Sequence, residues 1–329
     1  MVVFTESCLP FSEWLQCGQI SYTEFIGITL INGLTFVPAI LLNALVLAAI
    51  WKTSTLHTPA MILLSNLALS DLCVGLLAQP LLFSSITLEL NAYHLPDIYC
   101  TVSIAFGVIS SFVGVVSLVS ITAVAVDRFL AIYLHLRYPS VVTMKRAFVV
   151  CVAFWVFSSL LSVVWIVLGM DTYNVSFCVV MGICKCAIFT SYIQVYGVIK
   201  KHKLQIRAMA PTVSTELEII TSPRNIKRYA KSVTSSLYVY FAFVVCYAPC
   251  FCAFAYFGIT ADNCHSPSFI KVSMTLMFAN SAINPVIYYW RMTELRVAVR
   301  RTMLRSGRAT DLSGTGNGRC RREAEHEVN

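Results

Sequence analysis

An uncharged run extends from Thr101 to Val126 and is followed at once by Asp127 and Arg128. About 20 consecutive apolar residues are enough for a helix to cross the hydrocarbon core of a bilayer. Charged side chains deep in that core are costly, so an acid and a base at the end of such a run mark the place where lipid gives way to water. The pattern therefore predicts a membrane-spanning helix that ends at this pair.

Six further apolar runs of similar length lie along the chain. Hydrophobic residues make up 57% of the 329 residues and charged residues only 12%, about half the charged share of a soluble domain. We therefore expect an all-α membrane protein built as a seven-transmembrane helix bundle. The expected spans are Ile28–Ile50, Met61–Phe83, Thr101–Val126, Ala147–Leu168, Phe177–Ile199, Ser232–Phe257 and Ser268–Trp290.

The basic residues are divided unevenly between the two sets of loops that these spans define. Of the 24 Lys and Arg residues, 22 fall in one set, while the other set holds seven acids with Lys271 as its only base. The remaining base, Lys185, lies within a span. Lys and Arg concentrate in cytoplasmic loops. We expect a multi-pass plasma-membrane protein with its N-terminus outside and its C-terminus in the cytoplasm. The net charge of +8 then reflects attraction to an anionic inner leaflet and not nucleic-acid binding.

The chain is expected to form one membrane domain with short appendages. We assign residues 1–26 to an extracellular N-terminal segment, 27–291 to the seven-transmembrane domain and 305–329 to a disordered cytoplasmic tail. Residues 292–304 are amphipathic, with Leu295, Val299 and Met303 on one side and Arg296 and Arg300 on the other. This pattern is typical of a helix on the inner leaflet, and it predicts an amphipathic eighth helix.

Each expected span carries a motif, and the order of these motifs is informative. They are Asn43 in span 1, Asn66 and Asp71 in span 2, Asp127-Arg128-Phe129 in span 3, Trp155 in span 4, Tyr196 in span 5, Phe243 with Cys246-Tyr247-Ala248-Pro249 in span 6, and Asn284-Pro285-Val286-Ile287-Tyr288 in span 7. In this order they resemble the motifs of rhodopsin-like (class A) G-protein-coupled receptors over nearly all of Gly27–Leu304. The pattern is nearest to the melanocortin, lysophospholipid, cannabinoid and adenosine group, because span 5 has Ile188 where most relatives have proline.

The resemblance implies an ion site in the middle of the bundle. Asp71 is an acid in the middle of span 2, where a carboxylate requires a partner. Oxygen ligands around one carboxylate suit a hard cation such as Na⁺. The expected site comprises Asp71, Ser117, Asn280, Ser281 and Asn284. An allosteric Na⁺ is the only bound ion that we expect, and no cofactor is expected. The alternative is a water-filled polar network that lets Pro285 bend span 7.

The resemblance also implies a surface for a heterotrimeric G protein at the cytoplasmic end. Arg128 would contact the G protein, and in the inactive state Asp127 would hold the Arg128 side chain. The alternative is that Arg128 only extends its charged group to the membrane surface, as a snorkelling arginine does. The expected coupling residues are Asp127, Arg128, Leu136, Tyr196 and Tyr288. Pro249 should kink span 6 into a hinge. The expected switch residues are Phe243, Tyr247, Pro249 and Pro285. Tyr229 stands where many relatives carry an acid that clasps the arginine, which indicates looser restraint of the inactive state.

An extracellular ligand is expected between the outer halves of spans 3, 5, 6 and 7. The expected lining is Phe106, Ser110, Ser111, Gly114, Lys185, Phe251, Phe254 and Met274. Because this lining is mostly apolar, it favours a small amphiphile or a lipid-like ligand, and Ser110, where amine receptors carry aspartate, argues against a monoamine. Lys185 is hypothesised to pair with an acidic group of the ligand. Alternatively it faces lipid headgroups because span 5 starts later than predicted.

Two covalent features are expected on the outer face, together with some exclusions. The resemblance implies a disulfide between Cys100 and Cys178, whereas Cys264 could pair with Cys8 or Cys17 or stay free. Asn174, in Asn-Val-Ser, is the expected glycosylation site. The sequence has no metal-binding motif, phosphate-binding loop or nucleophile–base arrangement. We therefore expect that the protein is not an enzyme and that it has no motif-based metal site. A transporter or channel would predict inverted repeats, which the sequence lacks. A ligand-free partner of another receptor stays open.

Overall fold

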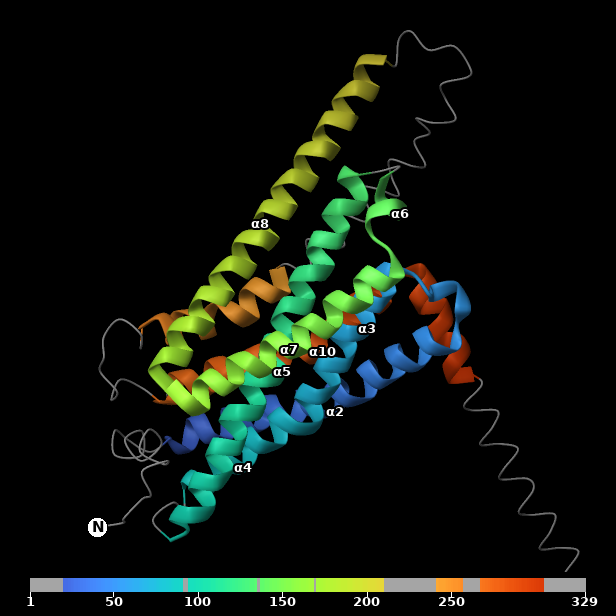
Figure 1. Cartoon of the computed structure of the whole chain (residues 1–329). Coiled ribbons are helices and arrows are strands. Elements are labelled where there is room, and N and C mark those ends of the chain that lie inside the picture. The colour runs from blue at the N-terminus through green and yellow to red at the C-terminus, as the bar shows by residue number, and fades with distance from the viewer. Residues whose placement is uncertain are drawn as a thin grey trace, which may run out of the picture.

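The structure is a computed structural model that describes residues 20–90, 94–134, 137–168, 170–209, 241–256 and 267–304. These residues are helical and contain no strand. Five of the described helices are long and apolar enough to cross a membrane, and Phe241–Tyr256 is a shorter apolar helix. Figure 1 shows the helices packed lengthwise into an elongated bundle.

Helix α2 (Tyr22–Lys52) contains the first expected span and has a well-defined start. The Ser21 hydroxyl accepts a hydrogen bond from the backbone N–H of Glu24, and the Glu24 carboxylate accepts one from the backbone N–H of Ser21 at 3.0 Å. This reciprocal arrangement is a capping box, which satisfies donors that the first helical turn leaves unpaired.

The second span is divided into α3 (Pro59–Cys73), a π-helical turn η3 (Val74–Ala78) and α4 (Gln79–Glu89). Single π-helical turns inside α-helices are frequent at functional sites, and this one begins three residues after Asp71. The helix also continues beyond the predicted end at Phe83. Glu89 therefore belongs to the helix and not to an outer loop.

Helix α5 (Pro96–Tyr133) forms the centre of the bundle and packs against α3, α4, α7 and α8. Its residues Val115, Val116 and Leu118 are completely buried. The short α6 (Tyr138–Val141) follows it, and α7 (Met144–Leu168) contains the fourth expected span. α5 is therefore the element that can link the two ends of the bundle.

Helix α8 (Met170–Met209) is longer than the predicted fifth span at both ends, and in Figure 1 it extends beyond the other helices at its C-terminal end. Because the helix begins at Met170, Asn174 lies inside it and is only 6% exposed. A glycan requires an asparagine at the surface. The predicted glycosylation of Asn174 is therefore wrong for this structure, because helix packing buries a segment that was interpreted as a loop.

The predicted disulfide between Cys100 and Cys178 is also wrong. Cys100 is disulfide-bonded, whereas Cys178 is a free, half-buried cysteine. The physical reason is again the early start of α8, which places Cys178 about two turns inside a helix and not in a loop beside Cys100. The partner of Cys100 lies outside the described residues, as do Cys8, Cys17 and Cys264.

Helix α10 (Pro267–Arg291) contains the seventh expected span, and residues 293–304 form the C-terminal helix. Leu295, Ala298 and Val299 of this last helix are buried, and it lies beside the segment that follows α2. Met303, predicted on the same apolar side, is instead 50% exposed. Of the sixth expected span, residues 241–256 are described, and the rest lies outside the described residues.

Candidate functional site

Asp71 of α3 is completely buried and accepts hydrogen bonds from two other helices. Its Oδ1 accepts from the hydroxyl of Ser117 in α5 at 3.0 Å and from the hydroxyl of Ser281 in α10 at 2.8 Å. Its Oδ2 accepts from the Nδ2 of Asn284 in α10 at 2.9 Å. A buried carboxylate is tolerated only when it is paired or hydrogen-bonded. These bonds therefore fix the middle of α3, α5 and α10 around one side chain.

Two further asparagines extend this polar framework to α2 and α7. Asn43 of α2 donates to the backbone carbonyl oxygen of Ser281 at 2.9 Å. Asn66 of α3 donates to the Ser120 hydroxyl at 2.7 Å and accepts from the indole N–H of Trp155 at 2.9 Å. Trp155 comes from α7, so hydrogen bonds link Asn66 of α3 to α5 and α7, while Asn43 links α2 to an α10 residue that donates to Asp71.

Unpaired oxygen atoms lie next to these bonds along α10. Neither end of the Asn280 carboxamide has a hydrogen-bond partner among the described residues, and neither does the Oδ1 of Asn284 or the hydroxyl of Tyr288. A buried carbonyl oxygen without a partner costs about 1–3 kcal/mol, and a hard cation takes such oxygens together with a carboxylate. The donor set of Asp71, Ser117, Asn280, Ser281 and Asn284 therefore fits Na⁺. That the chain binds sodium there stays a prediction.

At the other end of α5, Asp127 is held from two sides. An Arg128 guanidinium nitrogen lies 3.2 Å from Asp127 Oδ2, and the phenol of Tyr138 in α6 donates to Asp127 Oδ1 at 2.7 Å. Burial, and then the hydrogen bond to Asp127, raise the pKa of Tyr138 above its usual range, so the phenol stays a donor. Sequence reasoning missed Tyr138, because only the placement of the loop brings it to Asp127.

The structure brings only some of the other expected coupling residues near Arg128. Tyr288 of α10 is buried and lies within electrostatic reach of Arg128, whereas Tyr196 of α8 is 64% exposed. Leu136 lies outside the described residues, as does Tyr229. The structure therefore brings Asp127 and Tyr288 within reach of Arg128, and their part in coupling stays a prediction.

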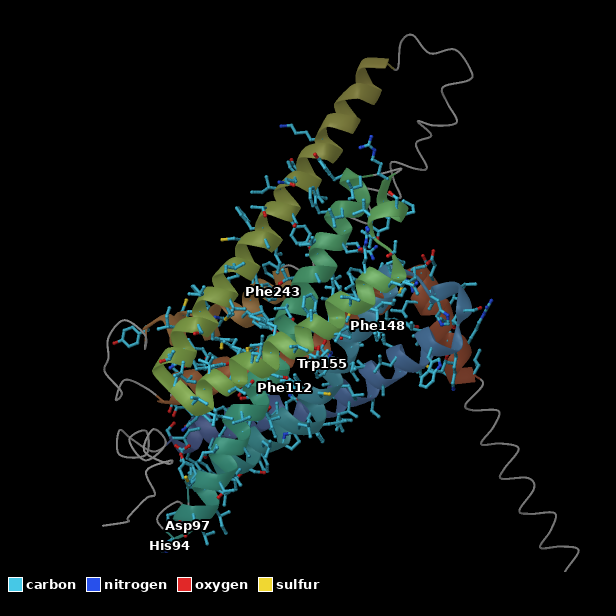
Figure 2. All side chains as sticks on the ribbon, in the orientation of Figure 1. His94, Asp97, Phe112, Phe148, Trp155 and Phe243 are labelled. Carbon is cyan, nitrogen blue, oxygen red and sulfur yellow. The ribbon has the colours of Figure 1, made fainter. Side chains whose placement is uncertain are left out.

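The expected switch residues lie between the two ends. The rings of Phe243 and Tyr247 stack with centroids 4.5 Å apart, and both side chains are buried. Pro249 lies in the same helix, and Pro285 lies inside α10. Figure 2 labels Phe243 on this helix and Trp155 on α7. Their action as a switch stays a prediction.

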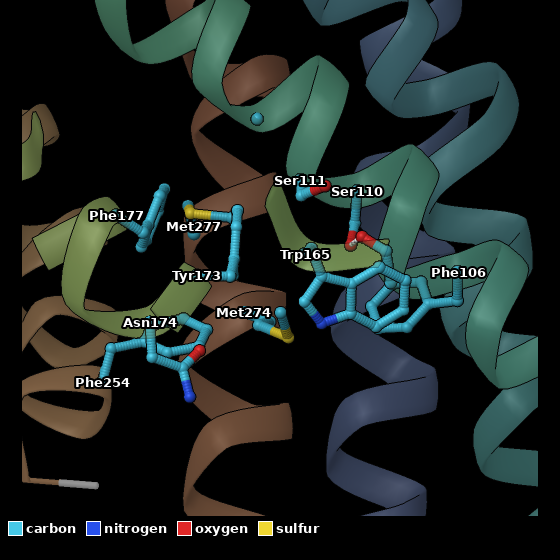
Figure 3. Close-up of a pocket in the computed structure, with 12 residues that line it drawn as sticks. Phe106, Ser110, Ser111, Trp165, Tyr173, Asn174, Phe177, Phe254, Met274 and Met277 are labelled. Carbon is cyan, nitrogen blue, oxygen red and sulfur yellow. Dashed lines mark hydrogen bonds between the residues drawn. The ribbon is translucent and has the colours of Figure 1, made fainter. Parts of the chain in front are cut away.

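A cavity of about 50 Å³ opens between α5, α7, α8, α10 and Phe241–Tyr256 (Figure 3). It is lined by Phe106, Gly107, Ser110, Ser111, Gly114, Trp165, Tyr173, Asn174, Phe177, Phe254, Met274 and Met277. Six of the eight residues predicted to line a pocket are therefore brought together. None of these lining residues is charged. Sequence reasoning missed the wall formed by Trp165 of α7 and by Tyr173, Asn174 and Phe177 at the start of α8.

Lys185 and Phe251, the other two predicted pocket residues, do not line this cavity. The Lys185 ammonium lies 3.9 Å from the centroid of the Phe251 ring, which is a cation–π contact between α8 and Phe241–Tyr256. Helix α8 starts earlier than the predicted span 5, which gives no support to the alternative of a later start, and that alternative stays open. The structure therefore gives Lys185 an aromatic partner within the bundle.

A buried ion pair, also missed by sequence reasoning, lies near the outer ends of α4 and α10. The Lys271 ammonium donates to Glu89 Oε1 at 2.6 Å and to Oε2 as well, and both side chains are buried. Glu24 of α2 lies nearby and accepts a hydrogen bond from Ser268 at 3.0 Å. The apolar runs placed Glu89 beyond the end of the second span and Lys271 near the start of the seventh, and nothing in their spacing indicated that they pair.

The chain matches the family described as 7 transmembrane receptor (rhodopsin family) over residues 42–288. It is 29% identical to melanocortin receptor 5 of Pan troglodytes over 282 residues, which cover 83% of each chain. It is 26% identical to melanocortin receptor 3 of Rattus norvegicus over 77% of this chain and 78% of the relative. It is also 26% identical to the histamine H2 receptor of Homo sapiens, over 91% of this chain and 89% of the relative.

Proposed function

Because the chain belongs to the rhodopsin family of 7 transmembrane receptors, we propose that it carries the signal of an extracellular ligand to a heterotrimeric G protein. It is a multi-pass membrane receptor and not an enzyme. The proposed domains are the extracellular residues 1–26, seven spans over 27–291, an eighth helix over 292–304 on the inner leaflet and a cytoplasmic tail over 305–329. The proposed location is the plasma membrane, with the N-terminus outside.

The observation that carries this proposal is the order of features along α5. Gly114 lines the cavity, Ser117 bonds Asp71 one turn farther on, and Arg128 lies eleven residues beyond Ser117, or about 16 Å along the helix. One rigid element therefore connects the cavity, the Asp71 network and the arginine. The alternative function is that of a transporter or channel. Such a protein would not require this order of features along one helix, and membership of a receptor family gives the alternative no support.

Helix α10 offers a second connection between the cavity and the network. Met277 lines the cavity, and Ser281, which donates to Asp71, follows about one turn later. A ligand that moves this part of α10 would therefore displace a donor to Asp71. Such a ligand biases a two-state bundle only if it binds one arrangement more tightly than the other. A bound Na⁺ would supply positive charge to the Asp71 carboxylate, and its loss on activation would make ion and ligand mutually exclusive.

A small amphiphile is the ligand class that the cavity favours. A volume of about 50 Å³ holds little more than one or two water molecules, each of which occupies about 30 Å³ in the liquid. A long lipid chain would require a much larger opening. A monoamine would find no carboxylate among the lining residues, although one relative is a histamine receptor. Melanocortin and histamine are therefore not proposed as ligands of this chain.

A ligand screen that reads cAMP and calcium together tests the proposal. The receptor should carry an N-terminal epitope tag, and unpermeabilised cells should bind the antibody if that terminus is outside. We expect at least one small amphiphile to change one of the two signals only in cells that express the receptor. A receptor that reaches the surface and changes neither signal, with or without any ligand and with promiscuous G proteins added, would contradict the proposed function.

A further inference from the structure

Asn174 supplies the one unsatisfied polar atom among the residues that line the cavity. It projects from the first turns of α8, it is 6% exposed, and its Oδ1 has no hydrogen-bond partner among the described residues. Figure 3 shows its carboxamide beside Phe254 and Met274. A buried carbonyl oxygen without a partner destabilises the protein unless a bound molecule donates to it.

The other hydroxyls in the lining are already used. Ser110 donates to the backbone carbonyl oxygen of Gly107 at 3.2 Å, and Ser111 donates to that of Val108 at 2.8 Å. Ser111 also lies 3.1 Å from the hydroxyl of Ser162. These hydroxyls keep acceptor lone pairs, but each already has a hydrogen-bond partner. Among the residues that line the cavity, Asn174 Oδ1 is the buried acceptor without a partner, so a ligand that donates to it gains the most.

The walls of the cavity are aromatic or contain sulfur. Phe177 meets Phe254 edge to face with centroids 5.3 Å apart, and Phe106 meets Phe278 in the same manner at 6.4 Å. Met274 and Met277 border the same space. Methionine is flexible and favours contact with aromatic rings. A flat aromatic molecule can therefore enter by displacing the two methionines without breaking a polar contact.

We propose that the Asn174 carboxamide is the anchor of a binding site for a small, uncharged aromatic ligand that donates one N–H or O–H to Oδ1. The ligand is proposed to be uncharged because the lining residues include no charge to pair with an ionic ligand, and burying an unpaired charge is costly. The inference rests on the proposed receptor function, since it takes this cavity as the ligand pocket. It names the chemistry of that ligand.

The same asparagine belongs to the sequence Asn174-Val175-Ser176, so a test of the ligand contact needs a control that removes this sequence without changing Asn174. A variant at Ser176 separates the effect of losing the glycosylation sequence from the effect of losing the Asn174 side chain. Its hydroxyl donates to the backbone oxygen of Thr172 and does not line the cavity. Ser176→Ala therefore removes the glycosylation sequence and leaves the Asn174 carboxamide in place, whereas Asn174→Leu removes both at similar volume.

The test compares indole with 1-methylindole, in which a methyl group replaces the hydrogen of the N–H donor; the Asn174 variants separate loss of the donor from the added volume. The full receptor is placed in lipid nanodiscs, and binding is measured as the rise in thermal unfolding temperature with each probe. We expect indole to bind about tenfold more tightly than 1-methylindole, the factor that one hydrogen bond can supply. The preference should persist in Ser176→Ala and disappear in Asn174→Leu. Asn174→Ala serves as the second variant if leucine is not accommodated. Tryptamine and indole-3-carboxylate, which are charged, should bind more weakly than indole.

Three results would overturn the assignment. They are equal binding of indole and 1-methylindole by the wild type, a preference for indole that survives in Asn174→Leu or Asn174→Ala, and tighter binding of either charged probe. The absence of binding by every uncharged probe would also overturn it. The measurement requires no G protein, so such a failure is distinguishable from a failure of the signalling screen.

Discussion

Neutralising one member of the Glu89–Lys271 pair should destabilise the receptor, and the two single variants should differ. Both side chains are buried, and the ammonium donates to both carboxylate oxygens. Breaking a buried ion pair leaves an uncompensated charge and costs about 3–5 kcal/mol. For a chain of 329 residues that loss corresponds to a fall of roughly 4–7 °C in the unfolding temperature by the scaling of soluble domains.

The asymmetry follows from the charges near each partner. In Glu89→Gln, Lys271 still has Glu24 within electrostatic reach, since the two carboxylates approach it from α2 and α4. In Lys271→Met, Glu89 loses the cation that pairs with it. Lys271→Met should therefore be the more destabilising change. The double variant Glu89→Leu with Lys271→Met should recover much of the loss, because an apolar pair of similar volume replaces a buried ion pair at little cost.

The assay is thermal unfolding of purified receptor in one detergent, with all variants treated alike. Asp97→Asn is the matched control, because Asp97 is an exposed acid at the start of α5. Adding the single variant Glu89→Leu closes the double-mutant cycle with Lys271→Met, and the coupling energy follows from that cycle. Unfolding temperatures of Glu89→Gln and Lys271→Met no lower than that of Asp97→Asn would refute a buried pair. A double variant as unstable as the sum of the two single variants would refute the coupling.

Three further changes test the interior of the bundle. Asp71→Asn should preserve surface expression and abolish any effect of Na⁺ on binding or thermal stability; a wild type that behaves identically in sodium and in a bulky organic cation would show that the ion site is absent. Tyr138→Phe removes the donor to Asp127 and should raise basal G-protein activation, and basal activity equal to that of the wild type would exclude a restraining role. Because the pKa of Tyr138 is raised, wild-type Tyr138 should keep this restraint past the pH at which a free tyrosine ionises. Gly107→Ala places a methyl group 2.5 Å from the Trp165 ring, so it should lower the stability of the fold by about 1–3 kcal/mol and weaken indole binding. The control is Gly182→Ala, whose methyl group meets nothing within 4 Å. Equal indole binding by the two variants would contradict the geometry of the cavity.

The spans and the Asp71 network were predictable because both depend on local patterns. Hydropathy over about 20 residues locates a span, and helical spacing places Ser281 and Asn284 on one face of α10. Asp71 stood out because an acid in the middle of a span requires partners. The structure then supplies hydrogen bonds from Ser117, Ser281 and Asn284.

The wrong predictions for residues near the start of α8 have one cause. Polar residues such as Asn174 after an apolar run were interpreted as loop, whereas α8 begins at Met170 and buries them. The predicted glycan at Asn174 and the predicted bridge to Cys178 both depended on that loop. Glu89 and Lys271 were counted with the extracellular loops because a hydropathy score rates each charged residue separately. Such a score cannot represent two charges that neutralise each other inside the bundle.

The missed site residues depend on contacts between distant segments. Tyr138 reaches Asp127 only through the placement of α6, and Trp165 borders the cavity only because α7 packs against α5 near Gly107. No periodicity in the sequence encodes such contacts. They follow from packing, which a single sequence does not reveal.

Nucleotide exchange on purified heterotrimeric G proteins tests the central claim most directly. The wild-type receptor in nanodiscs should accelerate GDP release from at least one class of Gα subunit, even without ligand, because the resemblance to class A receptors implies a tyrosine, Tyr229, in place of the acid that would restrain Arg128. Arg128→Ala should abolish that acceleration while indole still raises the unfolding temperature, since Arg128 lies far from the cavity along α5. Exchange that Arg128→Ala leaves undiminished, or a wild type that accelerates exchange on no Gα class, would contradict the account.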